Sequence, residues 1–305
     1  MLMSAPPLLF DRAQLRARLT RAAPGYGNAD FLKRRAAEDA VVRLEAILRD
    51  FPRAVDLGAR NGAFREALAL SDAASRVGLL VEADLAPAML AGREGPRIVA
   101  DEERLPFAFG SLDLVVSTLA LHWTNDVVGA LIQIRRALKP DGLFIGSMFG
   151  GATLTELRSS LLSAEIELTG GAASRISPFA DAYDAAGLLQ RSGFALPVAD
   201  VDKVTVRYSH PIKLLADLRA MGETSVLADR HPRALTKTVL ARAMELYVER
   251  FAEQDGRIPA TFEILTLTGW TPDASQQQPL KPGSAKMRLA DALGVVEQPL
   301  PREED

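Results

Sequence analysis

The chain has no cysteine among its 305 residues. This absence excludes disulfide bonds, cysteine-ligated zinc, cysteine-held iron–sulfur clusters and cysteine nucleophiles, and it fits a reducing compartment. No apolar run reaches the roughly 18 residues that a membrane-spanning helix needs. The apolar part of the first residues, MLMSAPPLLFDR, is too short for a signal peptide, and an acidic residue follows it too early. We therefore expect no transmembrane segment, and any association with a membrane would be peripheral.

An excess of positive charge is also absent, since the formal net charge is −3. Nothing in this balance favours a nucleic-acid partner. The three histidines are His122, His210 and His231, and none stands in an H-x-D/E pair. A metal centre with two histidines and one carboxylate is therefore not indicated. Apolar residues make up 48% of the chain, which is enough for a sizeable core.

Short apolar runs alternate with helical segments from residue 53 onwards. This alternation predicts an α/β fold in which helices cover both faces of a parallel sheet. Ahead of it, residues 11–21 and 31–48 predict two helices, the second ended by Pro52. We expect strands at 54–57, 77–84, 96–101, 112–119 and 142–149, with helices near 62–70, 86–91 and 126–138.

The pattern changes after residue 150, where longer helical segments dominate. We find no internal repeat and no clear linker, so we expect one domain over residues 1–305. Helices are predicted at 154–168, 176–194, 211–222 and 233–254, with strands at 195–209 and 261–270. The expected parts are N-terminal helices at 11–50, a core at 53–209 and 260–270, a helical insertion at 210–255 and a tail at 271–305.

Acidic residues follow three successive predicted strands, as Asp56, Asp84 and Asp101. The first belongs to DLGARNG, a glycine-containing turn that lets backbone approach a ligand closely. Carboxyl ends of parallel strands share one edge of a sheet, where such folds bind ligands. Asp84 suits a ribose diol and Asp101 an adenine amino group, although each acid taken alone is equally well explained as a solvated strand end.

Two ligands compete for this arrangement, a nicotinamide dinucleotide and S-adenosylmethionine. The dinucleotide fingerprint requires G-x-G-x-x-G/A with an acid about 20 residues further on. Here Gly58 is followed by Arg60, and Asp84 lies 28 residues after Asp56. The acidic third strand followed by LPF favours S-adenosylmethionine.

Several motifs resemble known families. DLGARNG, EADLAPAML, DEERLPF and LDLVVSTLALHWTNDVVGALIQIRRALKPDGLF resemble the successive motifs of class I S-adenosylmethionine-dependent methyltransferases. LALHWTND, IGSMFGGATLTELRSSL, RISPF, DLRAMGET, DGRIPATFEI and SQQQPLKPGSA resemble the complex I assembly factor 5 family of arginine hydroxylases, also described as methyltransferases. A more distant resemblance is to the malonyl-carrier-protein O-methyltransferase of biotin synthesis.

The resemblance implies a Rossmann-like seven-stranded sheet with strand order 3-2-1-4-5-7-6. It also implies that residues 210–255 form a lid over the substrate side, inserted between the last two strands. The implied cofactor is S-adenosylmethionine. The positions that would contact it are Asp56, Gly58, Arg60, Gly62, Asp84, Leu85, Asp101, Glu102 and Ser117.

Arg60 departs from the family pattern, which has glycine there to leave room for the methionyl end of the cofactor. Three interpretations stay open: the side chain points to solvent, it clamps the cofactor carboxylate, or it fills the pocket and prevents binding. Because the acids at the strand ends persist, we expect binding to be retained. We also expect Arg60 to affect only the methionine half of the site.

Substrate residues are harder to predict, because methyl transfer needs mainly positioning of the acceptor. His122 and Trp123 follow the fourth strand, so His122 is a candidate base and Trp123 its neighbour, or both are structural. Phe149 could wall the substrate pocket or belong to the core. The remaining candidates are Arg158 and Arg175 as anchors for an acidic group, Met221 in the lid and Tyr26 over the cofactor.

Three functions therefore compete. The first is an enzyme that methylates or hydroxylates a protein, a subunit of respiratory complex I, in a bacterial cytoplasm or on the mitochondrial matrix side. The second is an O-methyltransferase of a small molecule or acyl-carrier thioester. The third is a non-catalytic assembly chaperone with a degenerate cofactor pocket. The sequence indicates no oligomeric state.

Overall fold

The computed structural model describes residues 8–171, 175–229 and 235–277, together with Met287, Ala290, Asp291 and Gly294. One compact unit spans Met1–Pro272, and a second spans Asp273–Asp305. Most of the predicted tail, and residues 230–234 of the predicted lid with His231, lie outside the described residues. Among the described residues, no helix combines the length and the apolar character needed to cross a bilayer.

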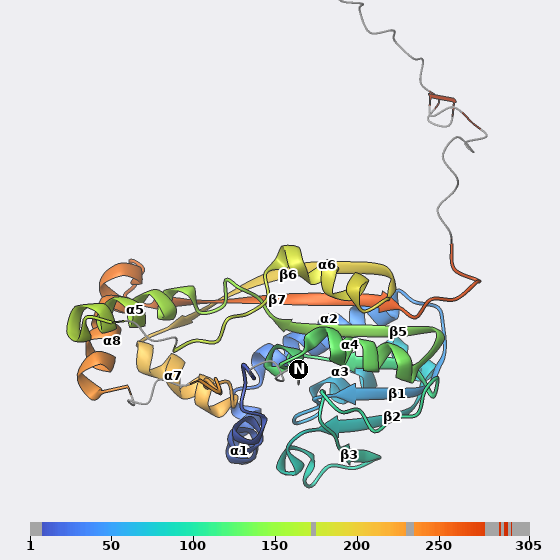
Figure 1. Cartoon of the computed structure of the whole chain (residues 1–305), viewed down its shortest axis with the longest axis horizontal. Coiled ribbons are helices and arrows are strands. Elements are labelled where there is room, and N and C mark those ends of the chain that lie inside the picture. The colour runs from blue at the N-terminus through green and yellow to red at the C-terminus, as the bar shows by residue number, and fades with distance from the viewer. Residues whose placement is uncertain are drawn as a thin grey trace, which may run out of the picture. The chain divides into compact units, whose positions relative to one another are not determined.

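The first unit is built on a seven-stranded sheet with order β3-β2-β1-β4-β5-β7-β6 (Figure 1), which confirms the predicted order. The pairs from β3 through β5 are parallel, whereas β7 runs antiparallel to β5 and to β6. The strands are β1 Phe51–Leu57, β2 Val77–Asp84, β3 Arg97–Val99, β4 Leu112–Ser117, β5 Leu138–Phe149, β6 Ala195–Tyr208 and β7 Ile258–Trp270.

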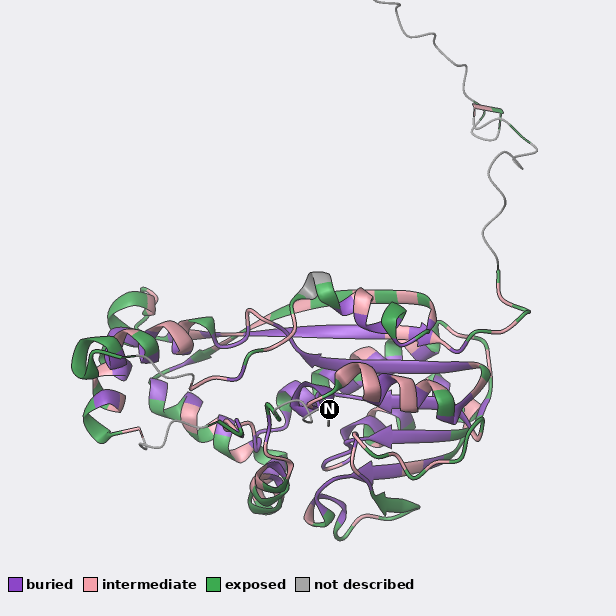
Figure 2. Ribbon diagram, viewed as in Figure 1, coloured by how far each residue is buried: buried purple, intermediate pink, exposed green. Residues whose placement is uncertain are grey.

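Helices cover both faces of this sheet because alternate strand residues point to opposite sides. One apolar core lies between the sheet and α2 and α3, and another lies between the sheet and α4 and α6. The central strands are accordingly buried almost throughout (Figure 2). The helices are α1 Arg12–Ala22, α2 Phe31–Glu45, α3 Ala63–Ala69, α4 Val127–Ala137, α5 Thr155–Thr169, α6 Ala182–Arg191, α7 Pro211–Ala220 and α8 Lys237–Phe251.

Several element boundaries differ from prediction. The helix predicted near 86–91 is only a 3₁₀ turn, Pro87–Leu90, and the one predicted from 176 begins at Ala182. Pro52 lies inside β1 rather than at a helix end. Its neighbours Phe51 and Arg53 pair with Val77 and Leu79 of β2, whereas proline has no N–H to donate to the ladder.

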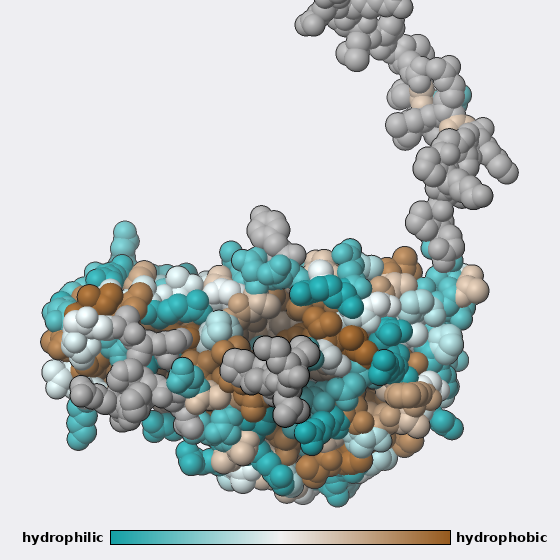
Figure 3. Space-filling model, in the orientation of Figure 1, coloured by the Kyte–Doolittle hydropathy of each residue, from teal (hydrophilic) through white to brown (hydrophobic). Residues whose placement is uncertain are grey.

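A third apolar core joins α5, α7 and α8 to the far parts of β6 and β7 (Figure 1). Helices α7 and α8 connect β6 to β7, where the insertion was predicted. The word lid is only a name for this insertion, residues 210–255. Apolar side chains reach the surface at this end (Figure 3), and they include Leu162, Ile166, Ile212 and Val248. A fourth core packs α1 against Leu85 and Trp123, so the N-terminal helix reaches the carboxyl edge of the sheet.

Candidate functional site

A tight turn joins β1 to α3 at the carboxyl edge of the sheet. Gly58 and Gly62 have φ angles of 74° and 77°, a region that glycine adopts without strain. A Cβ at Gly58 would clash with the Cβ of Ala120, and one at Gly62 would clash with the guanidinium of Arg93. The turn therefore needs glycine at both positions, which the sequence motif predicts.

Arg60 stands in the same turn with a φ of 52°, which is unfavourable for a side chain with a Cβ. Its backbone N–H donates to Asp84 Oδ2 at 2.9 Å, and its side-chain Nη1 donates to the same oxygen at 2.8 Å. The two side chains are 1% and 0% exposed. The interpretation that Arg60 points to solvent is therefore wrong.

This pairing changes which half of the predicted cofactor site Arg60 affects. Asp84 ends β2 and is the residue expected to bind the ribose; its Oδ1 already accepts from Ala86 N at 2.9 Å. Burial alone would lower the pKa of Arg60, but the charges of Asp84, Tyr26 and Glu102 outweigh this effect and raise the pKa above its ordinary value. The guanidinium therefore remains charged. The interpretation that Arg60 affects only the methionine half is therefore wrong.

The third strand-end acid also has an arginine partner. Arg12, on α1, donates through Nη2 to Asp101 Oδ1 at 2.6 Å and also pairs with Glu102. Its Nη1 donates to the backbone oxygen of Trp123 at 3.1 Å. The N-terminal helix thus ties the end of β3 to the loop after β4, a connection that no sequence motif indicated.

Lys33 is a second cation that sequence reasoning missed. It lies on α2, is buried, and its Nζ donates to the backbone oxygens of Gly58 and Thr118 at 2.7 and 2.6 Å. Burial lowers its pKa to about 8, although the charge of Asp56 opposes this. Burial likewise raises the pKa of Asp56 to about 6, with Lys33 opposing. Lys33 therefore fastens the glycine turn to the end of β4 with a charge that is costly to bury.

Lys33 leads to a prediction about pH. Its folded-state pKa is below the ordinary value of 10.5, so the unfolded chain binds more protons between these values and stability rises with pH there. We expect the unfolding free energy of the wild type to rise relative to Lys33→Met by roughly 2 kcal/mol between about pH 8 and about pH 10. Urea unfolding at several pH values measures this difference, and parallel curves for the two proteins would contradict it.

Buried polar atoms without partners show whether S-adenosylmethionine fits this edge. Both carboxylate oxygens of Asp56, the Ser117 hydroxyl, and Nε and Nη2 of Arg60 have no hydrogen-bond partner among the described residues. Buried polar atoms normally have partners, so these atoms suit a polar ligand bearing amino and hydroxyl groups. The chemical groups of these residues therefore suit S-adenosylmethionine, provided that the Arg60 guanidinium moves away from the Asp84 carboxylate.

The loop after β4 carries His122 and Trp123, and both contact a residue from the lid. Glu223 Oε2 lies 2.8 Å from Trp123 Nε1 and 3.0 Å from His122 Nε2. The His122 ring packs 4.8 Å from the ring of Phe149, centroid to centroid, and also near Phe179. The structure therefore brings three predicted residues together, and two of them, His122 and Trp123, contact Glu223, which was not predicted as a site residue.

A cavity of about 290 Å³ opens beside this cluster. Trp123, Phe179 and Glu223 line it together with leucines of α5 and α7. Arg175 also lines it and pairs with Glu165 at 2.6 Å. His122 and Phe149 are not in the lining; they stand behind Glu223 and Trp123. The cavity thus lies between the carboxyl edge of the sheet and the lid.

Two predicted substrate residues lie elsewhere. Met221 is buried in the lid core, and Arg158 makes only long contacts, of 3.5 Å, to the backbone oxygens of Thr153 and Ser177. Neither belongs to the cavity lining. Tyr26, by contrast, lies within electrostatic reach of both sites: burial raises its pKa, Arg60 opposes, and Glu223 and Asp84 add to the rise.

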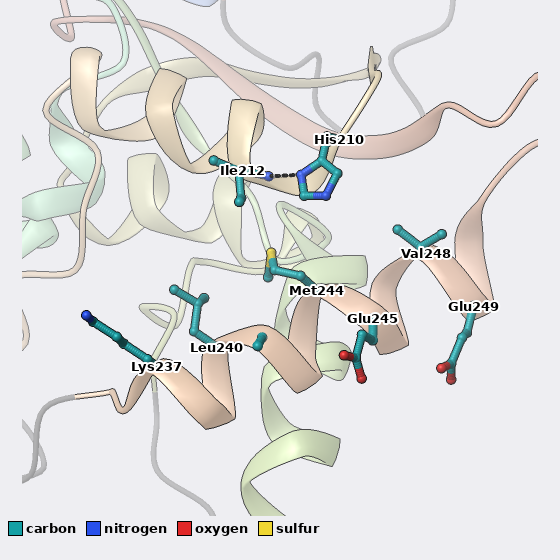
Figure 4. Close-up of a pocket in the computed structure, with 9 residues that line it drawn as sticks. His210, Ile212, Lys237, Leu240, Met244, Glu245, Val248 and Glu249 are labelled. Atoms are coloured by element: carbon teal, nitrogen blue, oxygen red, sulfur yellow. Dashed lines mark hydrogen bonds between the residues drawn. The ribbon is translucent and has the colours of Figure 1, made fainter.

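A second, more open hollow of about 610 Å³ lies along α8 (Figure 4). Its lining includes the apolar residues Ile212, Leu240 and Met244 and the charged residues Lys237 and Glu245. His210 Nδ1 accepts from the backbone N of Ile212 at 3.2 Å, so this histidine caps α7. None of the strand-end residues of the sheet lines this hollow.

Comparison with known proteins agrees with this geometry. Residues 55–146 match the family model described as "Methyltransferase domain". The mitochondrial arginine-hydroxylase NDUFAF5 of Homo sapiens is 39% identical over 300 residues, 96% of this chain and 85% of that protein, and the Danio rerio protein is 39% identical over 93% and 89%. The malonyl-[acyl-carrier protein] O-methyltransferase of Laribacter hongkongensis is 33% identical over 90% of this chain and 94% of its own.

Among solved structures, one from Bacillus halodurans C-125 superposes with a TM-score of 0.52 at 15% identity, covering 77% of this chain and 99% of the other. That likeness supports the fold alone. The domain match covers the end of β1 and all of β2, β3 and β4, and with them Asp56, Asp84 and Asp101. The chain therefore belongs to the NDUFAF5 family, and its core is a class I methyltransferase domain with S-adenosylmethionine as cofactor.

Proposed function

We propose that this chain is an S-adenosylmethionine-dependent enzyme that modifies an arginine side chain of a protein, a subunit of respiratory complex I. The observation that carries the proposal is the cavity between the sheet edge and the lid. Its walls are mostly leucines and aromatic rings, and a single carboxylate, Glu223, contributes negative charge. A long aliphatic side chain with a cationic end matches such a cavity.

The relatives support the choice of arginine, because the NDUFAF5 proteins are named arginine-hydroxylases. When bound, S-adenosylmethionine supplies an activated methyl group. The chain itself would hold that ligand with the acids at the ends of β1 and β2, and would exclude water with α1, the loop after β4 and the lid. We place the protein on the matrix side of mitochondria, as the mitochondrial relatives suggest, or in the cytoplasm if the source is bacterial.

Two measurements test the proposal. Calorimetric titration of the folded chain with S-adenosylmethionine should show binding, and none at millimolar cofactor would contradict every enzymatic interpretation. Mass spectrometry of purified complex I from a deletion strain should show one arginine peptide that lacks the added mass of a CH2 unit, from methylation, or of an oxygen atom, from hydroxylation. An unchanged peptide pattern with normal complex assembly would remove complex I as the target.

A second candidate is O-methylation of an acidic acyl-carrier thioester. It is favoured by Arg175 and Arg219, which both line the cavity, and by the O-methyltransferase relatives. The ion pair with Glu165 offsets the charge of Arg175, and Arg219 is exposed. Incubation with malonyl-acyl carrier protein and S-adenosylmethionine would reveal a methyl ester if this activity is present.

A further inference from the structure

Glu223 is the cavity-lining residue whose charge has no arginine or lysine partner among the described residues. Its side chain is 9% exposed, so this charge is carried in a largely desolvated place. Buried carboxylates are normally paired with a cation or strongly hydrogen-bonded. The question is therefore which group neutralises Glu223 when the cavity is filled.

His122 and Trp123 satisfy only one of the two carboxylate oxygens. Both ring N–H groups point to Oε2, at 3.0 and 2.8 Å. A carboxylate only accepts hydrogen bonds, so His122 carries its proton on Nε2. No hydrogen bond to Oε1 is formed by the described residues. The carboxylate is thus fixed by two donors while its second oxygen stays available.

The surroundings hold this arrangement rigid. His122 is enclosed by the rings of Phe149, Phe179 and Trp123. Trp123 is itself packed edge-on against Phe10, with centroids 5.3 Å apart. The backbone N of Glu223 donates to Leu218 O at 2.8 Å, at the end of α7. Orientation by such packed supports is what a binding carboxylate needs.

We infer that Glu223 is the receptor for the cationic head of the substrate, with His122 and Trp123 as its positioning residues. The ligand class is a guanidinium on an aliphatic stem, and the leucines of α5 and α7 contact the stem. A guanidinium forms charge-assisted hydrogen bonds with a carboxylate. Neither of the other cations that line the cavity forms an ion pair with Glu223 among the described residues, and Arg175 pairs with Glu165. The inference rests on the proposed function, for which it names the specificity-determining residue.

Nuclear magnetic resonance of the full chain tests this without cofactor or turnover. The chain has two tryptophans, so the indole N–H signals of Trp123 and Trp270 are easily told apart. The probes are N-acetyl-arginine methylamide and its neutral analogue N-acetyl-citrulline methylamide. We expect the arginine probe to shift the Trp123 signal, to leave Trp270 unchanged, and to bind at least about tenfold more tightly than the citrulline probe.

The substitution Glu223→Gln removes the negative charge of residue 223 but keeps an oxygen that accepts hydrogen bonds. The amide oxygen still accepts from both rings, so the Trp123 signal of the free protein should stay close to that of the wild type. Arginine-probe binding should fall at least about tenfold. Glu245→Gln is the matched control, because it removes one lid carboxylate that lies on α8 and pairs with Arg242.

Equal binding of the two probes, or unchanged binding by Glu223→Gln, would overturn the inference. A shift of Trp123 that is equally large in Glu223→Gln would do the same. These results are distinguishable from failure of the proposed function. A protein that binds the arginine probe through Glu223 but modifies no subunit would contradict only the function, and modification that survives Glu223→Gln would contradict only the inference.

Discussion

Arg60→Gly should tighten S-adenosylmethionine binding by at least about tenfold, or about 1.4 kcal/mol. In the wild type the Arg60 guanidinium occupies Asp84 Oδ2, so a ribose diol that binds Asp84, as we predict, would have to displace it. Glycine removes this competitor and also suits the φ of 52° better than arginine. The backbone donors of residue 60 and Ala86 to Asp84 remain, so the carboxylate keeps its orientation.

Calorimetric titration of wild type and variant measures the effect, with Arg60→Lys as the matched control. Lysine keeps a cation that can reach Asp84, so its affinity should stay near that of the wild type. Weaker binding by Arg60→Gly would contradict displacement and would indicate that Arg60 clamps the cofactor carboxylate. Unchanged affinity would mean that breaking the Arg60–Asp84 ion pair costs no free energy when the cofactor binds.

Asp84→Ala should produce the largest loss of stability among single changes at this edge. The substitution leaves the Arg60 guanidinium buried without a countercharge, at 1% exposure. Removing one partner of a buried pair costs about 3–5 kcal/mol. Cofactor binding should also weaken at least about tenfold, because a carboxylate that accepts from a diol is lost.

A double-mutant cycle separates these two effects. Arg60→Gly combined with Asp84→Ala removes both charges, so the unfolding free energy measured in urea should recover most of the loss. Cofactor affinity should remain low, because the acceptor oxygens are still missing. A stability loss below about 1 kcal/mol in Asp84→Ala would show that the pair matters little, and full cofactor affinity would exclude Asp84 from the site.

Sequence patterns anticipated the skeleton of the site well. Strand–helix alternation, the glycine turn and the family motifs led to the observed strand order, and the acids Asp56 and Asp84 end neighbouring strands as expected. The strands, the turn and the acids are readable because each depends on a short stretch of chain, whereas the strand order came from the resemblance to known families. The same reasoning placed His122 and Trp123 at the end of β4, and it left open whether His122 is a base that meets substrate or a structural residue.

The residues that pair with these site residues could not be predicted from the sequence. Arg12 reaches Asp101 across 89 positions, and Glu223 reaches His122 across 101. Arg12 and Lys33 lie on helices of mixed, ordinary composition, and nothing local distinguishes them from surface cations. Their burial follows from how α1 and α2 pack on the sheet edge, which no motif encodes.

Arg60 shows most clearly where the division falls. The sequence by itself determined the fold class and the glycine turn, and its resemblance to known families implied the order of the strands and showed that an arginine stands where the family has glycine. Only the tertiary structure decided that the Arg60 side chain turns inward to Asp84, that Arg12 and Lys33 close the same edge, and that the lid supplies Glu223 to the cavity. The reason is physical: backbone periodicity and turn geometry are local, whereas the pairing of buried charges depends on which segments the crossovers bring together.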